Sequence, residues 1–558
     1  MQNRSRDHAR AGRATAPETT CPRPPKLQHG ERVEAAYART ALLRQADGER
    51  SGRDGAIGGF RGRQRRYKLA GTTGPAADAE APAGSAMKEA ALPGPSRRDL
   101  GRMAVAAGAG LAAGPWLRAF AIARAEAKVV IVGGGAGGAT VAHALKAGAP
   151  DLDVTLIEAN PIYSSCFLSN LYLGGIRPLE SLNHSYAGLH RLNVWVVHDF
   201  AIDVDPIRRI VRTRGGRTYN YDRLVLSPGI DIKYDSIPGY SREAARVMPH
   251  AYTTEAASKR LLKRQLQQMR DGGIVAMAMP REPYRCPPAP YERACMIAHY
   301  LKARKPRSKL ILLDPKRAFA KQDLFIEAFA KYYKGIVELN LSDEMDDFGI
   351  ASLNPGTKEI ITHAGRKVRA DVANIIPQQR AGEIAAKAGC TEGDWCPVHP
   401  QSFLSRKMSD IHVLGDAAIA DDMPKSAFSA HSQAKAVVAD ILAALTKVER
   451  VEARFRNVCW SLLAPDDAVK MAADYAPHAG RLEASTAFVS QTGEPADVRR
   501  QNAQDNAAWY TAITSDMFAK AANGGQLLGG SGGDRGEPPK ADPPQPDPSK
   551  PDPFQSNH

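Results

Sequence analysis

Two cysteines of this 558-residue chain stand in similar local settings that suit sulfur redox chemistry. Cys286 is followed by Pro-Pro and Cys396 by Pro-Val, and each comes at the end of an expected strand or loop. In an oxidising compartment such a pair can form a disulfide. A sulfur nucleophile can then attack one sulfur and expel the other as a thiolate. The alternatives are a structural staple between domains or two buried free thiols, and the local sequence leaves all three open.

The other cysteines carry weaker signals. Cys166 follows an expected strand at a place where a bound cofactor ring would pass, although taken alone it is typical of a buried thiol. Cys295, Cys390 and Cys459 lie in helical or apolar patterns and are expected to fill the core. The chain has no C-x-x-C-H signature for c-type haem. It also has no C-x-x-C pair typical of zinc or an iron–sulfur cluster, so no metal site is predicted.

A glycine-rich turn predicts a dinucleotide. The apolar run 128–132 is typical of a buried parallel strand, and Gly133, Gly135 and Gly138 follow it in the G-x-G-x-x-G pattern. Such a turn places phosphates at a helix N-terminus, where free N–H groups and the helix dipole favour anions. A second strand, 153–157, leads to Glu158, about 20 residues downstream, where the pattern requires a ribose-binding acid.

A second βαβ pattern, beginning at 273–279 and reaching 309–314, lacks this phosphate site. Its first turn reads Pro280-Arg-Glu-Pro283. Proline supplies no backbone N–H and blocks the close approach that glycine permits, so a nicotinamide cofactor is disfavoured. Further on, a strand over 411–414 ends at Gly415-Asp416, and a helix follows. In flavoproteins with two dinucleotide domains, such an Asp binds the ribityl chain, which indicates FAD in a discontinuous first domain.

The beginning of the chain is predicted to be an export signal. Arg97-Arg98 precedes an Ala/Gly-rich run over 103–116 and a small-residue cleavage site near 123–125, which resembles a twin-arginine signal. Met87 is the expected true start. The first 125 residues carry a net charge of about +11, so only about +4 of the total +15 belongs to the remainder. The whole-chain basicity is therefore poor evidence for nucleic acid or an anionic membrane. No run is long enough for a transmembrane segment.

The predicted fold class is α/β, with two Rossmann-like dinucleotide-binding domains and a C-terminal interface domain. We expect a disordered extension at 1–86, a twin-arginine signal at 87–125, the first segment of a discontinuous FAD domain at 126–242, a pseudo-NAD domain at 243–372, the second segment of the FAD domain at 373–442, a C-terminal cytochrome-interface domain at 443–523 and a disordered tail at 524–558.

Several long motifs resemble the flavoprotein subunit of flavocytochrome c sulfide dehydrogenase, a relative of the sulfide:quinone oxidoreductases. The similarity runs from about Lys128 to Phe518, whereas the Gly/Pro/Asp-rich tail looks like an addition. The motifs that carry it are the glycine turn, Cys166-Phe-Leu-Ser-Asn170, Leu179-Glu-Ser-Leu-Asn-His-Ser-Tyr186, Arg285-Cys-Pro-Pro-Ala-Pro-Tyr-Glu-Arg293, Ile376-Pro-Gln-Gln-Arg-Ala-Gly382, Trp395-Cys-Pro-Val398 and Met423-Pro-Lys-Ser426. The C-terminal region that follows holds Val458-Cys-Trp-Ser-Leu-Leu-Ala-Pro465 and Trp509-Tyr510.

The resemblance implies roles for particular residues. Cys286 and Cys396 match the family's redox disulfide beside the flavin, and Cys166 matches the cysteine that carries FAD covalently. Glu292 matches a glutamate near the disulfide and is a candidate for proton transfer. The family's C-terminal region meets a small c-type cytochrome, so the expected partners are that cytochrome and sulfide or a related sulfur nucleophile.

These inferences predict a periplasmic FAD enzyme that oxidises sulfide through a redox disulfide and passes electrons to a c-type cytochrome. One alternative is a sulfide:quinone oxidoreductase at the membrane surface. That enzyme needs an amphipathic apolar C-terminal element, and 469–475 is short and mixed. The other alternative is a non-catalytic flavoprotein that transfers electrons, against which the presence of two suitably placed cysteines argues.

Overall fold

The first domain contains a parallel sheet assembled from distant segments of the chain. The computed structural model describes residues 127–446, 449–450 and 452–519. The sheet order is β20-β9-β1-β2-β5. Its strands are β1 (Lys128–Val132), β2 (Asp153–Ile157), β5 (Trp195–Val197), β9 (Arg223–Leu226) and β20 (Ile411–Val413). Since β20 pairs with β9 in parallel, the chain returns to this sheet after the second domain. The predicted export signal and tail lie outside the described residues.

The second domain has its own parallel sheet, in the order β13-β12-β11-β17. The strands are β11 (Ile274–Ala278), β12 (Lys309–Asp314), β13 (Val337–Leu341) and β17 (Val372–Ile375), and the helices are α6 (Ala256–Gln268), α7 (Ala289–Arg304) and α8 (Gln322–Tyr332). All but the first residue of β12 are buried, because α6, α7 and α8 pack on one face of the sheet and the short strands at 350–354, 359–362 and 367–369 pack on the other. The expected boundary between residues 372 and 373 falls inside β17, so this domain ends later than predicted.

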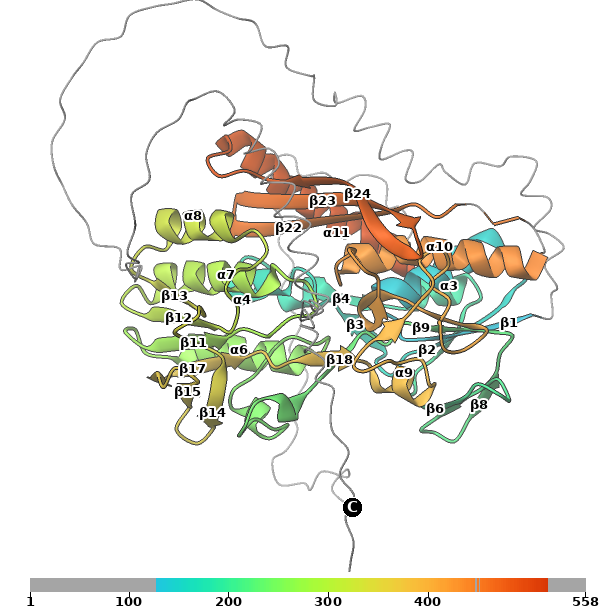
Figure 1. The fold of residues 1–558 in the computed structure, drawn as a ribbon, viewed down its shortest axis with the longest axis horizontal. Coiled ribbons are helices and arrows are strands. Elements are labelled where there is room, and N and C mark those ends of the chain that lie inside the picture. The colour runs from blue at the N-terminus through green and yellow to red at the C-terminus, as the bar shows by residue number, and fades with distance from the viewer. Residues whose placement is uncertain (1–126, 447–448, 451, 520–558) are drawn as a thin grey trace, which may run out of the picture. The chain divides into compact units, whose positions relative to one another are not determined.

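An antiparallel sheet with a long helix forms the C-terminal region. It comprises β22 (Phe455–Ala464), β23 (Asp467–His478), β24 (Arg481–Val489) and α11 (Ala496–Phe518). Helix α10 (Ala427–Thr446) precedes it and extends beyond the expected boundary at 442. Strand β22 contacts α7 and α8 of the second domain and α10 of the first (Figure 1). Helix α11 also bridges the domains, because Phe518 belongs to the first hydrophobic core and Tyr510 to the second.

Helix α3 (Ala136–Gly148) covers the first sheet and packs against α10. The remaining elements are short: β3 (Ile162–Ser164), α4 (Ser169–Gly174), β4 (Asn183–Ser185), α5 (Ala187–Arg191), β6 (Ala201–Asp205), β7 (Ile210–Thr213), β8 (Thr218–Asn220), β10 (Ile230–Ile232), β14 (Ile350–Asn354), β15 (Glu359–Thr362), β16 (Lys367–Arg369), β18 (Gln379–Ala381), α9 (Glu383–Lys387), β19 (Cys396–Pro397) and β21 (Ala418–Ile419). The two parallel sheets and their helices confirm the predicted α/β fold class.

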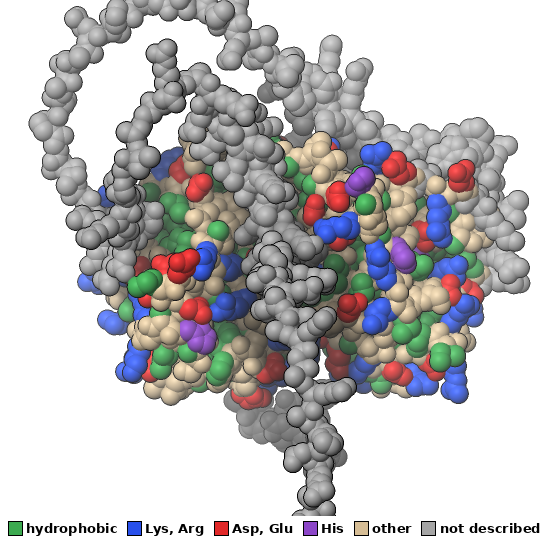
Figure 2. Space-filling view, in the orientation of Figure 1, with side chains coloured by type: hydrophobic (Ala, Val, Ile, Leu, Met, Phe, Trp, Pro, Cys, Tyr) green, Lys and Arg blue, Asp and Glu red, His purple; other side chains and the backbone are tan. Residues whose placement is uncertain are grey.

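The described surface mixes charges of both signs. On the face in Figure 2, Lys and Arg side chains are interspersed with Asp and Glu, and the visible described residues form no continuous basic stripe of the kind that follows nucleic acid. Within the described ranges, no helix has the length and apolarity that crossing a bilayer requires.

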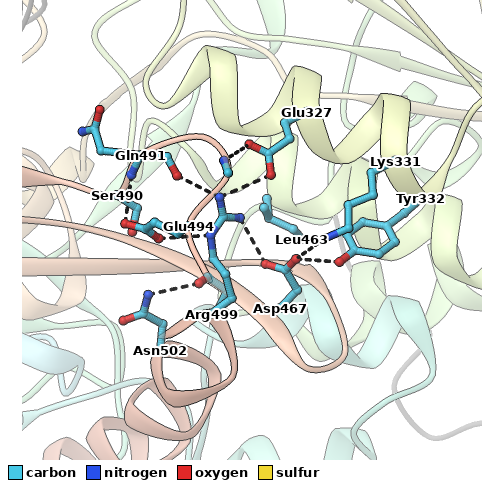
Figure 3. Close-up of polar contacts among 12 residues, drawn as sticks. Glu327, Lys331, Tyr332, Leu463, Asp467, Ser490, Gln491, Glu494, Arg499 and Asn502 are labelled. Atoms are coloured by element: carbon cyan, nitrogen blue, oxygen red, sulfur yellow. Dashed lines mark hydrogen bonds and ion pairs between the residues drawn. The ribbon is translucent and has the colours of Figure 1, made fainter. Parts of the chain in front are cut away.

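A buried arginine holds the C-terminal region against the second domain (Figure 3). The side chain of Arg499, on α11, is 3% exposed. Its guanidinium forms ion pairs with Asp467 of β23 at 3.2 Å, Glu327 of α8 at 3.3 Å and Glu494 at 3.0 Å. The Arg499 Nη2 also donates to the Gln491 carbonyl at 2.9 Å. Among the described residues, Glu327 and Glu494 form ion pairs only with Arg499, whereas Asp467 also pairs with Lys331 at 3.7 Å. The contact joins α11, β23 and α8.

Replacing Arg499 with Met should destabilise the protein strongly, because Glu327 and Glu494 would lose the cation that they pair with and Asp467 would keep only Lys331. Removing one partner of a buried ion pair costs about 3–5 kcal/mol. The matched control is Arg500→Met, since Arg500 is the next residue of α11 and is exposed. Thermal unfolding of the purified proteins measures the difference. Equal melting temperatures for the two variants would show that this cluster does not hold the C-terminal region in place.

Candidate functional site

The glycine turn forms as predicted at the end of β1. Gly133 has φ +98°, and a Cβ there would lie 2.3 Å from the Ser227 carbonyl oxygen. A Cβ on Gly138 would lie 2.0 Å from the Gly133 carbonyl oxygen, so only glycine permits this packing of helix against strand. Helix α3 begins just after Gly135 and points its N-terminus at the turn, which creates a site for an anion.

Glu158 lies beside this turn. Its Oε2 accepts a hydrogen bond from the Gly134 N–H at 2.8 Å, while Oε1 accepts from the backbone and side-chain amides of Asn160 at 2.9 and 3.0 Å. Glu158, Gly133 and Gly135 line the same cavity. The structure therefore brings together the turn and the acid that the sequence predicted as components of one nucleotide site.

Gly415 and Asp416 reach the same site from the returning segment. The Gly415 N–H donates to Gln433 Oε1 at 2.8 Å. The Asp416 carboxylate lines the cavity and faces Arg285 Nη1 at 4.0 Å, and its Oδ1 is buried without a hydrogen-bond partner among the described residues. Burial raises the pKa of Asp416. A buried acceptor without a donor is costly, so this oxygen suits a hydroxyl of a bound ligand such as the ribityl chain of FAD.

One cavity of about 330 Å³ joins these residues, and we call it the first cavity. It runs between the two dinucleotide domains and also reaches the C-terminal region. Its walls include Gly133, Gly135, Glu158, Cys166, Arg285, Cys286, Glu292, Asp416, Cys459, Trp460 and Trp509. The glycine turn, the ribose acid and the orphaned Asp416 oxygen fit FAD: the turn would hold the pyrophosphate, Glu158 the ribose and Asp416 the ribityl chain.

Cys166 lies in the wall of the first cavity, in the loop between β3 and α4. The buried Lys259 supports this loop, because its Nζ donates to the Ser165 carbonyl at 3.0 Å. Arg285 lines the same cavity. Cys166 is therefore accessible to a flavin in this cavity and has cations near it.

The structure places Cys459, rather than Cys396, beside Cys286. The Cys286 thiol donates a hydrogen bond to the Cys459 sulfur. This contact raises the pKa of Cys286 and, together with the nearby charge of Lys321, lowers the pKa of Cys459 to about 7. Cys459 was expected to fill the core, but it lines both cavities of the site with Cys286.

Cys396 occupies a different environment. It lies in β19, which pairs with β21, and its side chain is fully buried in the core of the first domain. Burial raises the pKa of this thiol to about 12, with a further contribution from Cys390. Cys396 lines neither cavity. The structure thus does not bring Cys286 and Cys396 together, and the pairing drawn from their similar settings has to be corrected. A proline that follows a cysteine does not indicate which residue the cysteine contacts in the folded protein.

The position of Cys286 is set by its backbone. Its φ is +54°, in the left-handed region, and its N–H donates to the Lys425 carbonyl at 2.7 Å. The Tyr252 hydroxyl donates to the carbonyls of Arg285 and Cys286 at 2.6 and 3.3 Å. These contacts hold the loop before α7 so that the thiol meets β22.

Glu292 lies on α7, in the first turn after this loop. Its Oε1 accepts from the Leu462 N–H at 2.9 Å and its Oε2 from Asn170 Nδ2 at 2.7 Å. The residue is 8% exposed, and burial raises its pKa although Lys321 and Arg293 oppose the shift. The negative charge of Glu292 acts on both Cys286 and Cys459, so the predicted acid does belong to the cysteine site.

Lys321 is the residue that the sequence did not suggest. It precedes α8 and has φ +63°. Its Nζ donates to the Cys459 carbonyl at 2.7 Å and to Ser461 Oγ at 3.0 Å. No motif singles it out, because a lysine before a helix is usually a solvated side chain. Cys459 lies in the segment 458–465, which was predicted to belong to the cytochrome interface, and its apolar neighbours gave no signal of a contact with Cys286.

A second cavity of about 480 Å³ lies on the other side of the cysteine pair. Cys286, Cys459 and Ser426 line both cavities. Apolar side chains make up much of the second wall, including Tyr284, Pro287, Phe319, Leu324, Met423, Met471 and Val489. Some of this wall comes from the loop after β11, where the sequence has Pro280 and Pro283 instead of a glycine turn. The cysteine pair therefore separates a nucleotide cavity from an apolar one.

Family models match three segments of the chain. Residues 127–270 match "Pyridine nucleotide-disulphide oxidoreductase", and residues 259–377 match "Sulfide dehydrogenase (flavocytochrome c) flavoprotein chain, central". Residues 451–518 match "Flavocytochrome c sulphide dehydrogenase, flavin-binding". The last segment contains Cys459, and the central one contains Cys286, Glu292 and Lys321.

Two curated proteins that are named for sulfide and quinone are similar in sequence to this chain. The mitochondrial sulfide:quinone oxidoreductase of Mus musculus is 20% identical over 327 residues, covering 56% of this chain and 70% of that protein. The sulfide-quinone reductase of Aquifex aeolicus is 29% identical over 185 residues, covering 33% of this chain and 41% of that protein.

Two solved structures share the fold. The sulfide:quinone oxidoreductase of Aquifex aeolicus has a TM-score of 0.56 at 20% identity and covers 71% of this chain and 93% of that one. Putidaredoxin reductase, in its covalent complex with putidaredoxin, has a TM-score of 0.51 at 17% identity, with coverages of 71% and 100%. With the fold and the site geometry, these matches identify the chain as an FAD-binding oxidoreductase related to the flavoprotein chain of flavocytochrome c sulfide dehydrogenase and to sulfide:quinone oxidoreductases.

Proposed function

We propose that this protein oxidises sulfide through a redox disulfide between Cys286 and Cys459. The observation that carries the proposal is the contact between these two sulfurs at the boundary of the two cavities. The nucleotide cavity provides the place for FAD, and the apolar cavity provides access for a small sulfur nucleophile. The family matches supply the substrate class, because sulfide is named in both the family models and the relatives.

The chemistry begins with the oxidised pair. HS⁻ attacks Cys286 Sγ, a new sulfur–sulfur bond forms, and the Cys286–Cys459 bond breaks with its electron pair on Cys459. Cys459 is the better leaving group because its thiol has the lower pKa, about 7. A second HS⁻ then attacks the outer sulfur of the Cys286 persulfide, which releases a disulfide anion and leaves both cysteines reduced.

When bound, FAD supplies the acceptor for the electron pair that is released as the two cysteines return to the disulfide. The chain's residues place both sulfurs in the wall of the first cavity for this transfer. Glu292 is placed to take up the proton that the sulfur nucleophile loses, since burial raises the pKa of this carboxyl above its usual range. Asn170 and the Leu462 N–H fix its two oxygens.

The second cavity suits both the substrate and its product. Polysulfur chains are apolar and polarisable, and the Met and aromatic side chains of this wall provide matching surroundings. Its volume of about 480 Å³ leaves room for more than one sulfur atom beside the cysteines.

Changing the cysteines one at a time tests the route. Cys459→Ser and Cys286→Ser should each abolish sulfide-dependent bleaching of the flavin, because neither protein can form the disulfide. Cys396→Ser is the matched control and should bleach at the rate of the unaltered protein. Stopped-flow absorbance measures the effect. Loss of bleaching in Cys396→Ser together with retention in Cys459→Ser would restore the pairing suggested by the sequence.

We further propose that FAD is attached covalently through Cys166. The support is the position of Cys166 in the wall of the first cavity and the match to the family's flavin-binding cysteine. After acid precipitation the flavin should remain with the unaltered protein and appear in the supernatant for Cys166→Ser, which absorbance of the two fractions measures. Free flavin from the unaltered protein would show that the attachment is noncovalent.

We propose a c-type cytochrome as the electron acceptor and the periplasm as the location. The match of residues 451–518 to a flavocytochrome c model supports the first, and the twin-arginine pattern supports the second. A quinone is the second candidate acceptor, because the related curated proteins are named for it.

Turnover assays with each acceptor separate the two. With sulfide as donor, the protein should reduce cytochrome c at least tenfold faster than a soluble quinone analogue, because its C-terminal region matches a flavocytochrome c model. Reduction of the quinone analogue that a quinone-site inhibitor stops, with no cytochrome reduction, would establish the quinone alternative instead.

A further inference from the structure

Lys321 is a buried lysine that forms no ion pair with a carboxylate among the described residues. It is 8% exposed, burial lowers its pKa, and its ammonium forms no ion pair within the described residues. Its ammonium instead donates to the Cys459 carbonyl and to Ser461 Oγ, both on β22. Burying an unpaired charge is costly, so a lysine in this position calls for a compensating anion.

The groups that face this ammonium define that anion. Charges acting on Lys321 come from Cys459, Glu292 and Cys286. Glu292 shares its two carboxylate oxygens between the Leu462 N–H and Asn170, so neither oxygen binds Lys321. Cys286 acts as a hydrogen-bond donor and keeps its proton. The Cys459 sulfur, which accepts that hydrogen bond, is the group best placed to carry negative charge beside the lysine.

We propose that Lys321 is a positioning residue that holds Cys459 as a thiolate and thereby makes it the sulfur that leaves when HS⁻ attacks Cys286. This inference rests on the proposed function and assigns the direction of the disulfide cleavage. The bond between the two cysteine sulfurs breaks, and its electron pair stays on Cys459 opposite the ammonium. No proton has to reach that sulfur, because Lys321 compensates its charge. When the disulfide anion leaves, the proton that the sulfur nucleophile lost passes to Cys286, and the resulting Cys286 thiol then faces the Cys459 thiolate.

The competing role for Lys321 is mechanical. Its hydrogen bonds tie the start of α8 to β22, and a lysine used only as a tether would support the fold without affecting the ionisation of Cys459. The two roles differ in one measurable property, the pH at which Cys459 becomes a thiolate. The pKa of Cys459 is lowered to about 7, so the thiolate should appear as the pH rises through about 7. Without the lysine, that midpoint should move upward.

Alkylation of the chemically reduced, full-length flavoprotein measures this midpoint. Iodoacetamide reacts with thiolates, and peptide mass spectrometry assigns the modification to Cys459 or Cys286 at each pH. Lys321→Met should raise the Cys459 midpoint by one pH unit or more, toward the ordinary thiol value of about 8.5. At pH 7 the alkylation of Cys459 should then slow by roughly tenfold. Lys321→Arg, which keeps the charge, should retain most of the low midpoint.

Lys331→Met is the matched control, because Lys331 lies in the last turn of α8, which Lys321 precedes, is 54% exposed and forms its ion pair with Asp467. Its Cys459 midpoint should equal that of the unaltered protein. The proposal would be overturned if the Cys459 midpoint is unchanged in Lys321→Met, or if Lys321→Arg raises it as much as Lys321→Met does. Lys321 would then have only the mechanical role of joining α8 to β22. Far-UV circular dichroism and thermal unfolding identify any variant that fails to fold, and Lys321→Gln then provides a second uncharged replacement.

The assay does not depend on turnover. A shifted midpoint in a protein that does not oxidise sulfide would support the role of Lys321 and refute the proposed substrate. Sulfide oxidation with an unshifted midpoint would support the substrate and refute the role of Lys321.

Discussion

The contact between the Cys286 and Cys459 sulfurs is the interaction on which the site depends. Cys286 belongs to a loop of the second domain, and Cys459 belongs to a strand of the C-terminal region. The contact exists only where these two regions meet, and it lies where the first and second cavities adjoin. The contacts that hold β22 against α7 and α8 therefore also set the distance between the two cysteines.

Buried charged groups maintain that approach at two places. Arg499 joins α11, β23 and α8 through three carboxylates, and Lys321 joins the start of α8 to β22 beside Cys459. Buried ion pairs contribute little net stability compared with apolar packing, but they penalise any arrangement that leaves one partner alone. This property suits an interface in which a small displacement would separate two sulfurs.

The two cavities on either side of the cysteine pair differ in polarity. The first cavity has a glycine turn, a ribose acid and a buried carboxylate oxygen without a donor among the described residues, all of which are features of a polar nucleotide site. The second cavity has apolar walls formed in part by a loop in which prolines replace the glycine turn. The same proline-containing loop therefore replaces the glycine turn and supplies some of the apolar wall of the second cavity.

The sequence by itself determined the fold class, the phosphate turn, Glu158, Asp416 and the place of Cys166 beside the nucleotide site, because each depends on local periodicity or on a motif with fixed spacing. It also drew attention to Cys286 and Glu292. Only the tertiary structure showed that Cys459 lies beside Cys286 and that the Lys321 ammonium donates to the Cys459 carbonyl. Cys459 lies among apolar residues along a strand, which is the pattern of a core residue. A local sequence pattern cannot indicate which side chains come into contact when three distant regions of the chain pack together.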